Sequence, residues 1–354
     1  MSHKVIQWAT GTVGIHAVPG ILAHPELELA GLWVHSESKV GRDAGEICGI
    51  DPCGVEATND ADALLALDAD VICYTAHSDM RPDAVVDDLC RMLEAGKNVV
   101  NTSFVPLLNP WSASAGDGVG DRLQAACEAG GASFFSSGID PGFGNAELAI
   151  QMMSLSERVE SVRMMEIVDY STWNNPFTLF EIMGFSKKEA TESLLLSPGS
   201  ITLAWGPVVE LVGRALGVEL DSIEEEIEVI HAEEDLTIDA GVIPAGTISG
   251  MRFQIKGMVD GVAAIVVEHV TRMQEGDAPD WPQGQGYRIE IGGEPSMVAT
   301  LELDSARGDH NTAGCMATAM RVLNAIPNLV AAEPGVYTAL ELPVFTAAGI
   351  HPNG

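Results

Sequence analysis

The fold is decided by the stretch Lys4-Val5-Ile6-Gln7-Trp8-Ala9-Thr10-Gly11-Thr12-Val13-Gly14, which predicts a strand, a tight turn and the start of a helix. The turn has the form A-x-G-x-x-G, with Ala9 where the usual fingerprint has its first glycine. In such a turn one glycine lets the backbone approach a pyrophosphate, the last glycine lets the helix pack on the strand, and free helix N–H groups bind phosphates. We therefore predict dinucleotide binding at Gly11, Thr12, Val13 and Gly14.

Alternating strand and helix patterns follow this turn. Short apolar runs typical of buried strands occupy 29–35, 71–75, 98–102 and 133–136, and helical patterns lie at 82–95 and 117–129. Strands that alternate with helices indicate a parallel, doubly wound sheet, whose ligand lies at the carboxyl ends of the strands. We predict an α/β protein with an N-terminal Rossmann domain.

Composition excludes several classes of protein. The chain has 354 residues, 46% of them hydrophobic and 19% charged, which is typical of a folded chain with two domains. The formal net charge of −33 argues against nucleic-acid and anionic-membrane partners, because phosphate groups need a basic surface. An acidic stretch from Glu224 to Asp235 lacks the spacing of a calcium loop and is expected to be a solvated strand or loop.

The six cysteines form no C-x-x-C pair and no metal-ligand spacing, so we expect reduced thiols, no metal and a cytoplasmic protein. Polar residues lead directly into the first strand, and no apolar run reaches membrane-spanning length. We expect neither a signal peptide nor a membrane partner.

The end of the second strand indicates which nicotinamide cofactor binds. An acidic residue there binds the ribose of NAD, whereas basic residues accommodate the phosphate of NADP. This strand ends at His35 and Ser36 without a carboxylate, and the next loop contains Lys39 and Arg42. We predict NADP(H) in preference to NAD(H), bound in part by these four residues; the alternative is that both cations only make the loop soluble.

The pattern changes after residue 140. Alternating residues at 251–259 and 262–273 flank Asp260-Gly261, a two-residue turn typical of tight hairpins, and alternation continues at 288–291 and 297–303 around Gly292-Gly293. Helical patterns lie at 145–153, 178–183, 201–215 and 312–325. We predict a C-terminal α+β domain on an antiparallel or mixed sheet. The expected limits are 1–140 for dinucleotide binding, 141–308 for substrate and oligomerisation, and 309–354 for a helix and tail that return to the first domain.

The chain resembles the dihydrodipicolinate reductase-like superfamily, most closely the branch with 2,4-diaminopentanoate dehydrogenase and the native amine dehydrogenases. Besides the architecture and the N-terminal turn, the resemblance rests on Lys39-Val40-Gly41-Arg42-Asp43-Ala44-Gly45-Glu46, Gly138-Ile139-Asp140-Pro141-Gly142-Phe143, Asn324-Ala325-Ile326-Pro327 and Pro334-Gly335. It implies an NAD(P)-dependent oxidoreductase that assembles as a homodimer or larger homo-oligomer through its C-terminal sheet.

Two departures from the resemblance bear on the substrate. The histidine pair and lysine with which dihydrodipicolinate reductases bind a dicarboxylate have no counterpart here, so lysine biosynthesis is not expected. The amine dehydrogenases share a C-E-E-L segment whose glutamate handles ammonia, whereas residues 101–111 of this chain contain no carboxylate. We therefore expect weak or absent ammonia-dependent activity, unless Asp140 or another carboxylate enters the pocket.

Hydride transfer to C=N or C=O needs a held nicotinamide, an apolar pocket and a proton donor. Predicted strand ends place further cofactor contacts at Thr75, Ala76, His77, Thr102 and Ser103, with Pro141 at the same edge. The donor candidates are Asp140, Tyr170 and His269, although each has a structural alternative: a turn, a half-buried strand position or a core histidine. Phe143, Trp173 and Phe177 are candidates for an apolar pocket wall, or are plain core.

The leading hypothesis is therefore an NAD(P)H-dependent oxidoreductase that acts on a small, fairly apolar imine, amine or carbonyl. The predicted substrate domain is poor in arginine and lysine for its length, which argues against a dicarboxylate substrate. One alternative is an alcohol, carbonyl or cyclic-imine reductase without an ammonia step. The other is a dinucleotide-binding protein without catalysis.

Overall fold

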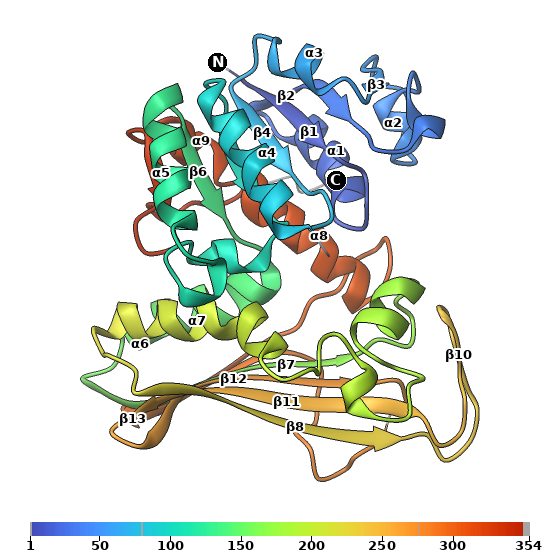
Figure 1. Ribbon diagram of the computed structural model, residues 1–354, viewed down its shortest axis with the longest axis vertical. Helices are drawn as coiled ribbons and strands as arrows, with labels where there is room; N and C mark the ends of the chain where they lie inside the picture. Colours follow the sequence, from blue (N-terminus) through green and yellow to red (C-terminus); the bar gives the residue numbers. More distant parts are fainter. Residues whose placement is uncertain (1, 79–80, 275, 350–354) are drawn as a thin grey trace. The chain divides into compact units, whose positions relative to one another are not determined.

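A seven-stranded sheet forms the first unit in the computed structural model, which describes residues 2–78, 81–274 and 276–349 (Figure 1). Its order is β15-β6-β5-β4-β1-β2-β3, and every neighbouring pair is parallel. The order reverses between β1 and β4, which makes this the switch point where Rossmann sheets bind ligands. The strands are β1 (His3–Trp8), β2 (Leu27–Trp33), β3 (Ala57–Thr58), β4 (Val71–Tyr74), β5 (Asn98–Asn101), β6 (Ser133–Ser136) and β15 (Gly335–Tyr337).

Helices cover both faces of this sheet. On one face α1 (Gly14–Ala23) shares a hydrophobic core with α8 (His310–Leu323) and α9 (Ile326–Val330). On the other face α4 (Pro82–Glu94) packs against α5 (Val119–Gly130) (Figure 1). Two short helices, α2 (Ala44–Ile47) and α3 (Ala61–Leu65), lie in the connections on either side of β3. The predicted parallel, doubly wound sheet is confirmed.

The chain divides into two compact units. Unit 1 contains residues 1–111, 116–139 and 315–354, and unit 2 contains residues 112–115 and 140–314. The functional limits expected from the sequence, 1–140, 141–308 and 309–354, remain predictions. No helix among the described residues is long and apolar enough to cross a membrane.

Unit 2 is built on a mixed six-stranded sheet in the order β14-β13-β7-β12-β11-β8, in which only β7 and β12 pair in parallel. Its strands are β7 (Arg158–Asp169), β8 (Ser222–His231), β11 (Ile248–Val259), β12 (Val262–Arg272), β13 (Gly286–Glu294) and β14 (Met297–Leu301). The helix α7 (Ser200–Leu216) packs on β8, β11 and β12, and α6 (Leu148–Met153) on β7 and β13. A separate hairpin joins β9 (Leu236–Ile238) to β10 (Gly241–Ile243).

The predicted hairpin of β11 and β12 is confirmed, with Asp260 at φ 50° and Gly261 at φ 74°, as a tight two-residue turn requires. The alternating runs predicted at 288–291 and 297–303, around Gly292-Gly293, overlap the antiparallel pair β13 and β14. The two glycines lie inside β13, and the chain turns after Glu294. A side chain at Gly293 would place its Cβ 2.0 Å from the carbonyl oxygen of Arg158, so close backbone approach explains the glycine.

Candidate functional site

A cavity of about 420 Å³ opens at the carboxyl ends of β1, β2, β4 and β5 in unit 1. Its lining includes Gly11, Thr12, Val13, His35, Ser36, Lys39, Thr75, Ala76, His77, Thr102 and Ser103. The structure therefore gathers eleven of the predicted cofactor residues around one cavity. Gly14, Arg42 and Pro141 are not in this lining, and Pro141 belongs to unit 2.

The two glycines of the turn, Gly11 and Gly14, have different roles. A Cβ on Gly14 would lie 2.2 Å from the carbonyl oxygen of Ala9 and 2.6 Å from Thr75 Oγ1, so Gly14 allows α1 to start against the strands. A Cβ on Gly11 would meet nothing within 4 Å, which leaves the space above the turn open. Ala9 adopts φ 77°, the left-handed conformation that glycine favours at this position of the fingerprint.

The loop after β2 presents Lys39 to the cavity. Lys39 Nζ donates to Thr10 Oγ1 at 2.9 Å and lies 3.3 Å from the carbonyl oxygen of Thr10. Glu37 accepts a hydrogen bond from Asn59 Nδ2 at 2.8 Å, and Arg42 is exposed. A lysine and hydroxyl groups thus lie at the end of β2, where a Rossmann sheet contacts the adenosine ribose.

Unit 2 contains a row of side chains across four strands. Strand pairing places Phe253 of β11 beside His269 of β12, His269 beside Glu166 of β7, and Glu166 beside Tyr287 of β13. Because these four residues are register partners, their side chains lie on one face of the sheet. His269 Nδ1 lies 3.0 Å from Glu166 Oε2, and the Phe253 ring stacks on the imidazole at 4.8 Å.

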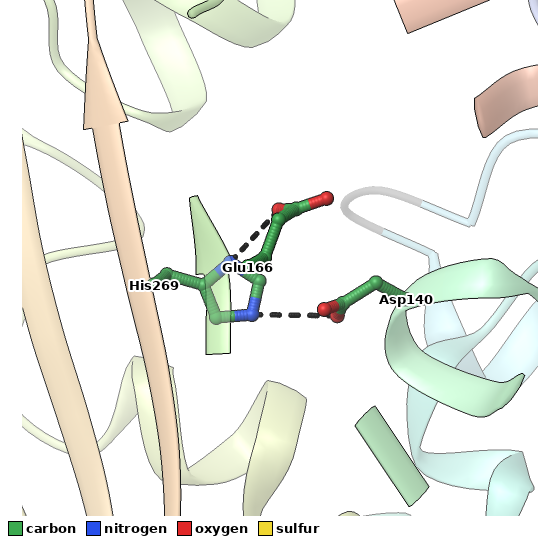
Figure 2. A group of neighbouring side chains, drawn as sticks. All are labelled: Asp140, Glu166 and His269. Atoms are coloured by element: carbon green, nitrogen blue, oxygen red, sulfur yellow. Dashed lines mark ion pairs between the residues drawn. The ribbon is translucent and has the colours of Figure 1, made fainter. Parts of the chain in front are cut away.

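Asp140 completes this cluster from the segment 139–147. Figure 2 shows His269 between two carboxylates, with its Nε2 directed at Asp140 Oδ1, 3.3 Å away. The same oxygen accepts hydrogen bonds from Trp205 Nε1 at 2.8 Å and from Asn145 Nδ2 at 2.7 Å. The side chains of Asp140, Glu166 and His269 are 3%, 8% and 6% exposed, so the three form a buried cluster of opposite charges.

Burial and charge shift the pKa values in this cluster in different directions. Burial raises the pKa of Asp140, and the nearby Glu166 carboxylate adds to the rise against the effect of His269. Burial also acts to raise the pKa of Glu166, but hydrogen bonds with His269 and Tyr287 and the charge of His269 bring it below its ordinary value. Burial acts to lower the pKa of His269, yet Asp140 and Glu166 raise it to about 10.

Known proteins match the chain along its whole length. The family model described as 2,4-diaminopentanoate dehydrogenase C-terminal domain matches residues 145–351, and the model of the dihydrodipicolinate reductase N-terminus matches residues 5–103. An amine dehydrogenase from Streptomyces virginiae is 39% identical over 354 residues, which cover 98% of each chain.

The chain belongs to this amine dehydrogenase family. A 2,4-diaminopentanoate dehydrogenase from Acetoanaerobium sticklandii is 25% identical over 63% of this chain and 60% of its own. The solved structure of an amine dehydrogenase from Mycobacterium smegmatis has the same fold, with a TM-score of 0.74 and 19% identity over 98% of this chain and 97% of that one. The family and the dinucleotide-binding fold identify a dinucleotide-dependent oxidoreductase, as the sequence predicted.

Two of the three predicted catalytic residues, Tyr170 and His269, contact one carboxylate that the sequence reasoning missed. Glu166 contacts His269 and accepts a hydrogen bond from the Tyr170 hydroxyl at 3.3 Å, while Asp140 lies on the other side of the imidazole. The aromatic rings of Trp205 and Phe253, also missed, flank His269. The one available signal for Glu166 was its position in an apolar stretch, Met164-Met165-Glu166-Ile167-Val168.

The predicted pocket aromatics are less closely grouped. Trp173 packs against Tyr170 with ring centroids 4.8 Å apart. Phe143 is half-buried, and Phe177 is 51% exposed. Their role as a pocket wall therefore stays a prediction.

Asp140, Glu166 and His269 also lie close enough together to be ligands of one metal ion. A histidine that binds a metal presents one deprotonated nitrogen and donates from the other. Here each imidazole nitrogen faces a different carboxylate, and the pKa of about 10 means that the ring carries both protons near neutral pH. The geometry fits a salt-bridged imidazolium better than a metal centre.

Proposed function

We propose that this enzyme transfers hydride between NADP(H) and a small, fairly apolar imine or amine, or the corresponding carbonyl compound. The observation that carries the proposal is the buried cluster of Asp140, His269 and Glu166 with Tyr170 at its edge, because such groups can exchange a proton with the substrate heteroatom. The S. virginiae relative, named an amine dehydrogenase, supports the choice of substrate class.

NADP is the proposed cofactor because Lys39, Ser36 and His35 line the cavity at the end of β2. The carboxylate of Glu37, in the same loop, accepts a hydrogen bond from Asn59. An ammonium group and hydroxyl donors suit a phosphate monoester. Gly11, Thr12, Val13, Thr75, Ala76, His77, Thr102 and Ser103 are proposed to contact the rest of the dinucleotide, with Gly14, Arg42 and Pro141 as further candidates outside the cavity lining.

The contacts of three arginines in unit 2 favour a small apolar substrate. Arg163 and Arg252 bind the buried carboxylate of Glu268, and Arg272 donates to the carbonyl oxygens of Asp277 and Pro282. These guanidinium groups already have partners, which disfavours a dicarboxylate substrate. Phe143, Trp173 and Phe177 are the proposed apolar wall.

The proposed amine chemistry needs a carboxylate that handles protons, and residues 101–111 contain none. Asp140 and Glu166 are carboxylates supplied by another part of the chain. The sequence predicts little ammonia-dependent activity unless Asp140 or another carboxylate enters the pocket. We propose that Asp140 is this carboxylate and handles the protons of the amine chemistry. A homodimer or larger homo-oligomer in the cytoplasm completes the proposal; all six cysteines are free thiols, in keeping with a reducing compartment.

The test is oxidation of NADPH with a panel of small aldehydes and ketones, with and without high ammonium. Ammonium-dependent turnover that yields an amine supports the proposal. Equal turnover without ammonium, with an alcohol as product, would favour the carbonyl-reductase alternative. NADPH binding without turnover for any carbonyl or cyclic imine would favour a non-catalytic dinucleotide-binding protein.

A further inference from the structure

The two carboxylates beside His269 differ in how completely they are hydrogen-bonded. Glu166 receives hydrogen bonds from His269 and from the hydroxyl groups of Tyr170 and Tyr287. These donors come from β12, from the residue after β7, and from β13. A buried carboxylate with three donors is strongly held in its charged form.

Asp140 has the opposite arrangement. Its Oδ1 accepts from Trp205 and Asn145 and faces His269 Nε2, whereas its Oδ2 is buried and has no hydrogen-bond partner among the described residues. An unpartnered buried oxygen destabilises a folded protein, so its presence in a cluster of titratable groups points to a ligand or a reaction that uses it. Of the cluster atoms that lack a hydrogen-bond partner among the described residues, His269 Nε2 still faces Asp140 Oδ1 at 3.3 Å, whereas Asp140 Oδ2 has no such contact.

We propose that Asp140 is the catalytic residue that exchanges a proton with the substrate nitrogen or oxygen through Oδ2, and that Glu166 is a positioning residue that holds His269 as an imidazolium against Asp140. This inference rests on the proposed function. It assigns different roles to two carboxylate side chains because their hydrogen-bond partners differ.

In the reductive direction the step balances as follows. A hydride from NADPH forms a C–H bond at the carbon of C=N or C=O, and the π electron pair moves to the nitrogen or oxygen. That atom takes the proton from Asp140 Oδ2, which leaves NADP⁺, a neutral amine or an alcohol as product, and an Asp140 carboxylate. The neighbouring imidazolium of His269 stabilises the new carboxylate charge. The oxidative direction reverses each movement.

The charged and titratable groups around Asp140 agree with this division. His269 and Glu166 shift the pKa of Asp140 directly, and the hydroxyl groups of Tyr287 and Tyr170 donate hydrogen bonds to Glu166. His310 contributes to the lowered pKa of Glu166. The pKa of Asp140 is raised and that of Glu166 is lowered, the arrangement expected of an acid beside a permanent anion. A protonated Asp140 is required for reduction, so the reductive rate falls on the alkaline side of its pKa.

The experiment compares kcat against pH for wild type, Asp140→Asn, Glu166→Gln and Trp205→Phe, with NADPH affinity and unfolding midpoints measured alongside. Asp140→Asn is expected to lose activity by about 100-fold or more and to bind NADPH normally. Glu166→Gln is expected to lose less activity, and its pH profile changes because the imidazolium loses its partner. Trp205→Phe removes one donor to Asp140 Oδ1, so the alkaline limb moves to higher pH.

Glu268→Gln is the matched control, since this buried carboxylate lies one residue from His269 but pairs with Arg163 and Arg252. It is expected to lower stability and leave the pH profile in place. An active Asp140→Asn variant, or an alkaline limb that stays fixed in Trp205→Phe, would overturn the inference. Wild-type protein that binds NADPH without turning over any substrate would instead overturn the proposed function.

Discussion

His269 holds the buried cluster together because it carries the positive charge between two carboxylates (Figure 2). The pKa of His269 is about 10 in the folded chain against an ordinary value of 6.5. A raised pKa contributes stability that is fully present below pH 6.5 and is lost as the pH rises through about 10. We predict that His269→Gln lowers the free energy of unfolding by about 3–5 kcal/mol at pH 6, since it leaves two buried carboxylates without a cation.

Urea unfolding at pH 6 and pH 10.5 measures this effect. The difference between wild type and His269→Gln should narrow at the higher pH. His231→Gln is the control, because His231 is exposed on β8 and its loss should change stability little at either pH. An equal difference at both pH values would contradict a charged His269.

The chemistry of this residue could be anticipated only in part. His269 alternates with Ile265 and Val267, so the sequence placed it on a buried face. Its partner Glu166 could not be found in the same way, because the parallel pairing of β7 with β12 joins positions far apart in the chain. Asp140 was a candidate from its motif. That its Oδ2 lacks a hydrogen-bond partner could not be predicted, because it depends on Trp205 and Asn145 both donating to Oδ1.

Lys39 and Arg42 provide a second test at the scale of single residues. Lys39 lines the cavity and contacts Thr10, whereas Arg42 is exposed outside the lining. The sequence alone suggested that Arg42→Ala would weaken the preference for NADP by roughly 1–3 kcal/mol. With the structure we predict the larger loss, of about that size, for Lys39→Ala and a smaller one for Arg42→Ala. Isothermal titration calorimetry of the wild type and both variants with NADPH and with NADH measures these losses. Equal dissociation constants of the wild type for NADPH and NADH would contradict the preference for NADP(H).

At the scale of elements, the turn between β1 and α1 makes a prediction about two glycines. Gly11→Val adds a side chain into open space, so it should abolish dinucleotide binding while changing the unfolding free energy by no more than about 0.5 kcal/mol. Gly14→Val should destabilise the fold, because its Cβ would collide with the Ala9 carbonyl oxygen. Cofactor titration and denaturant unfolding of both variants test this. Normal cofactor binding by Gly11→Val would mean that the pyrophosphate lies elsewhere.

Elements with strong local signals were predictable from the sequence, and those that depend on distant partners were not. The turn at Asp260-Gly261 specified the hairpin of β11 and β12 through its positive φ angles. The strand β7 was missed because Arg158 to Asp169 carries charged and apolar residues on both faces of the sheet. One face of β7 contributes Glu166 to the cluster, and the other face contributes Arg163 to the ion pair with Glu268. Neither face is therefore purely apolar in the sequence.

At the scale of the whole molecule, the second face of the unit 2 sheet bears on assembly. Strand pairing places Val298 of β14 in one row with Glu290 and Arg163, and Val298 is 64% exposed. An exposed apolar residue beside partly buried ion pairs suits a face that a second copy covers. We predict a homodimer or larger assembly by light scattering at micromolar concentration. Val298→Glu should shift it toward monomer, whereas Val344→Glu, also exposed, should not; a monomeric wild type would contradict this.

The central claim about the whole molecule is the proposed transfer of hydride from NADPH to the carbon of a small imine. The most direct test of this account is the fate of the transferred hydrogen. The protein is incubated with a small ketone, ammonium and NADPH deuterated at the nicotinamide C4, and the product is analysed by mass spectrometry and NMR. The account predicts an amine that carries deuterium on the former carbonyl carbon. A deuterated alcohol as the sole product, or no deuterium transfer to any product, would contradict it.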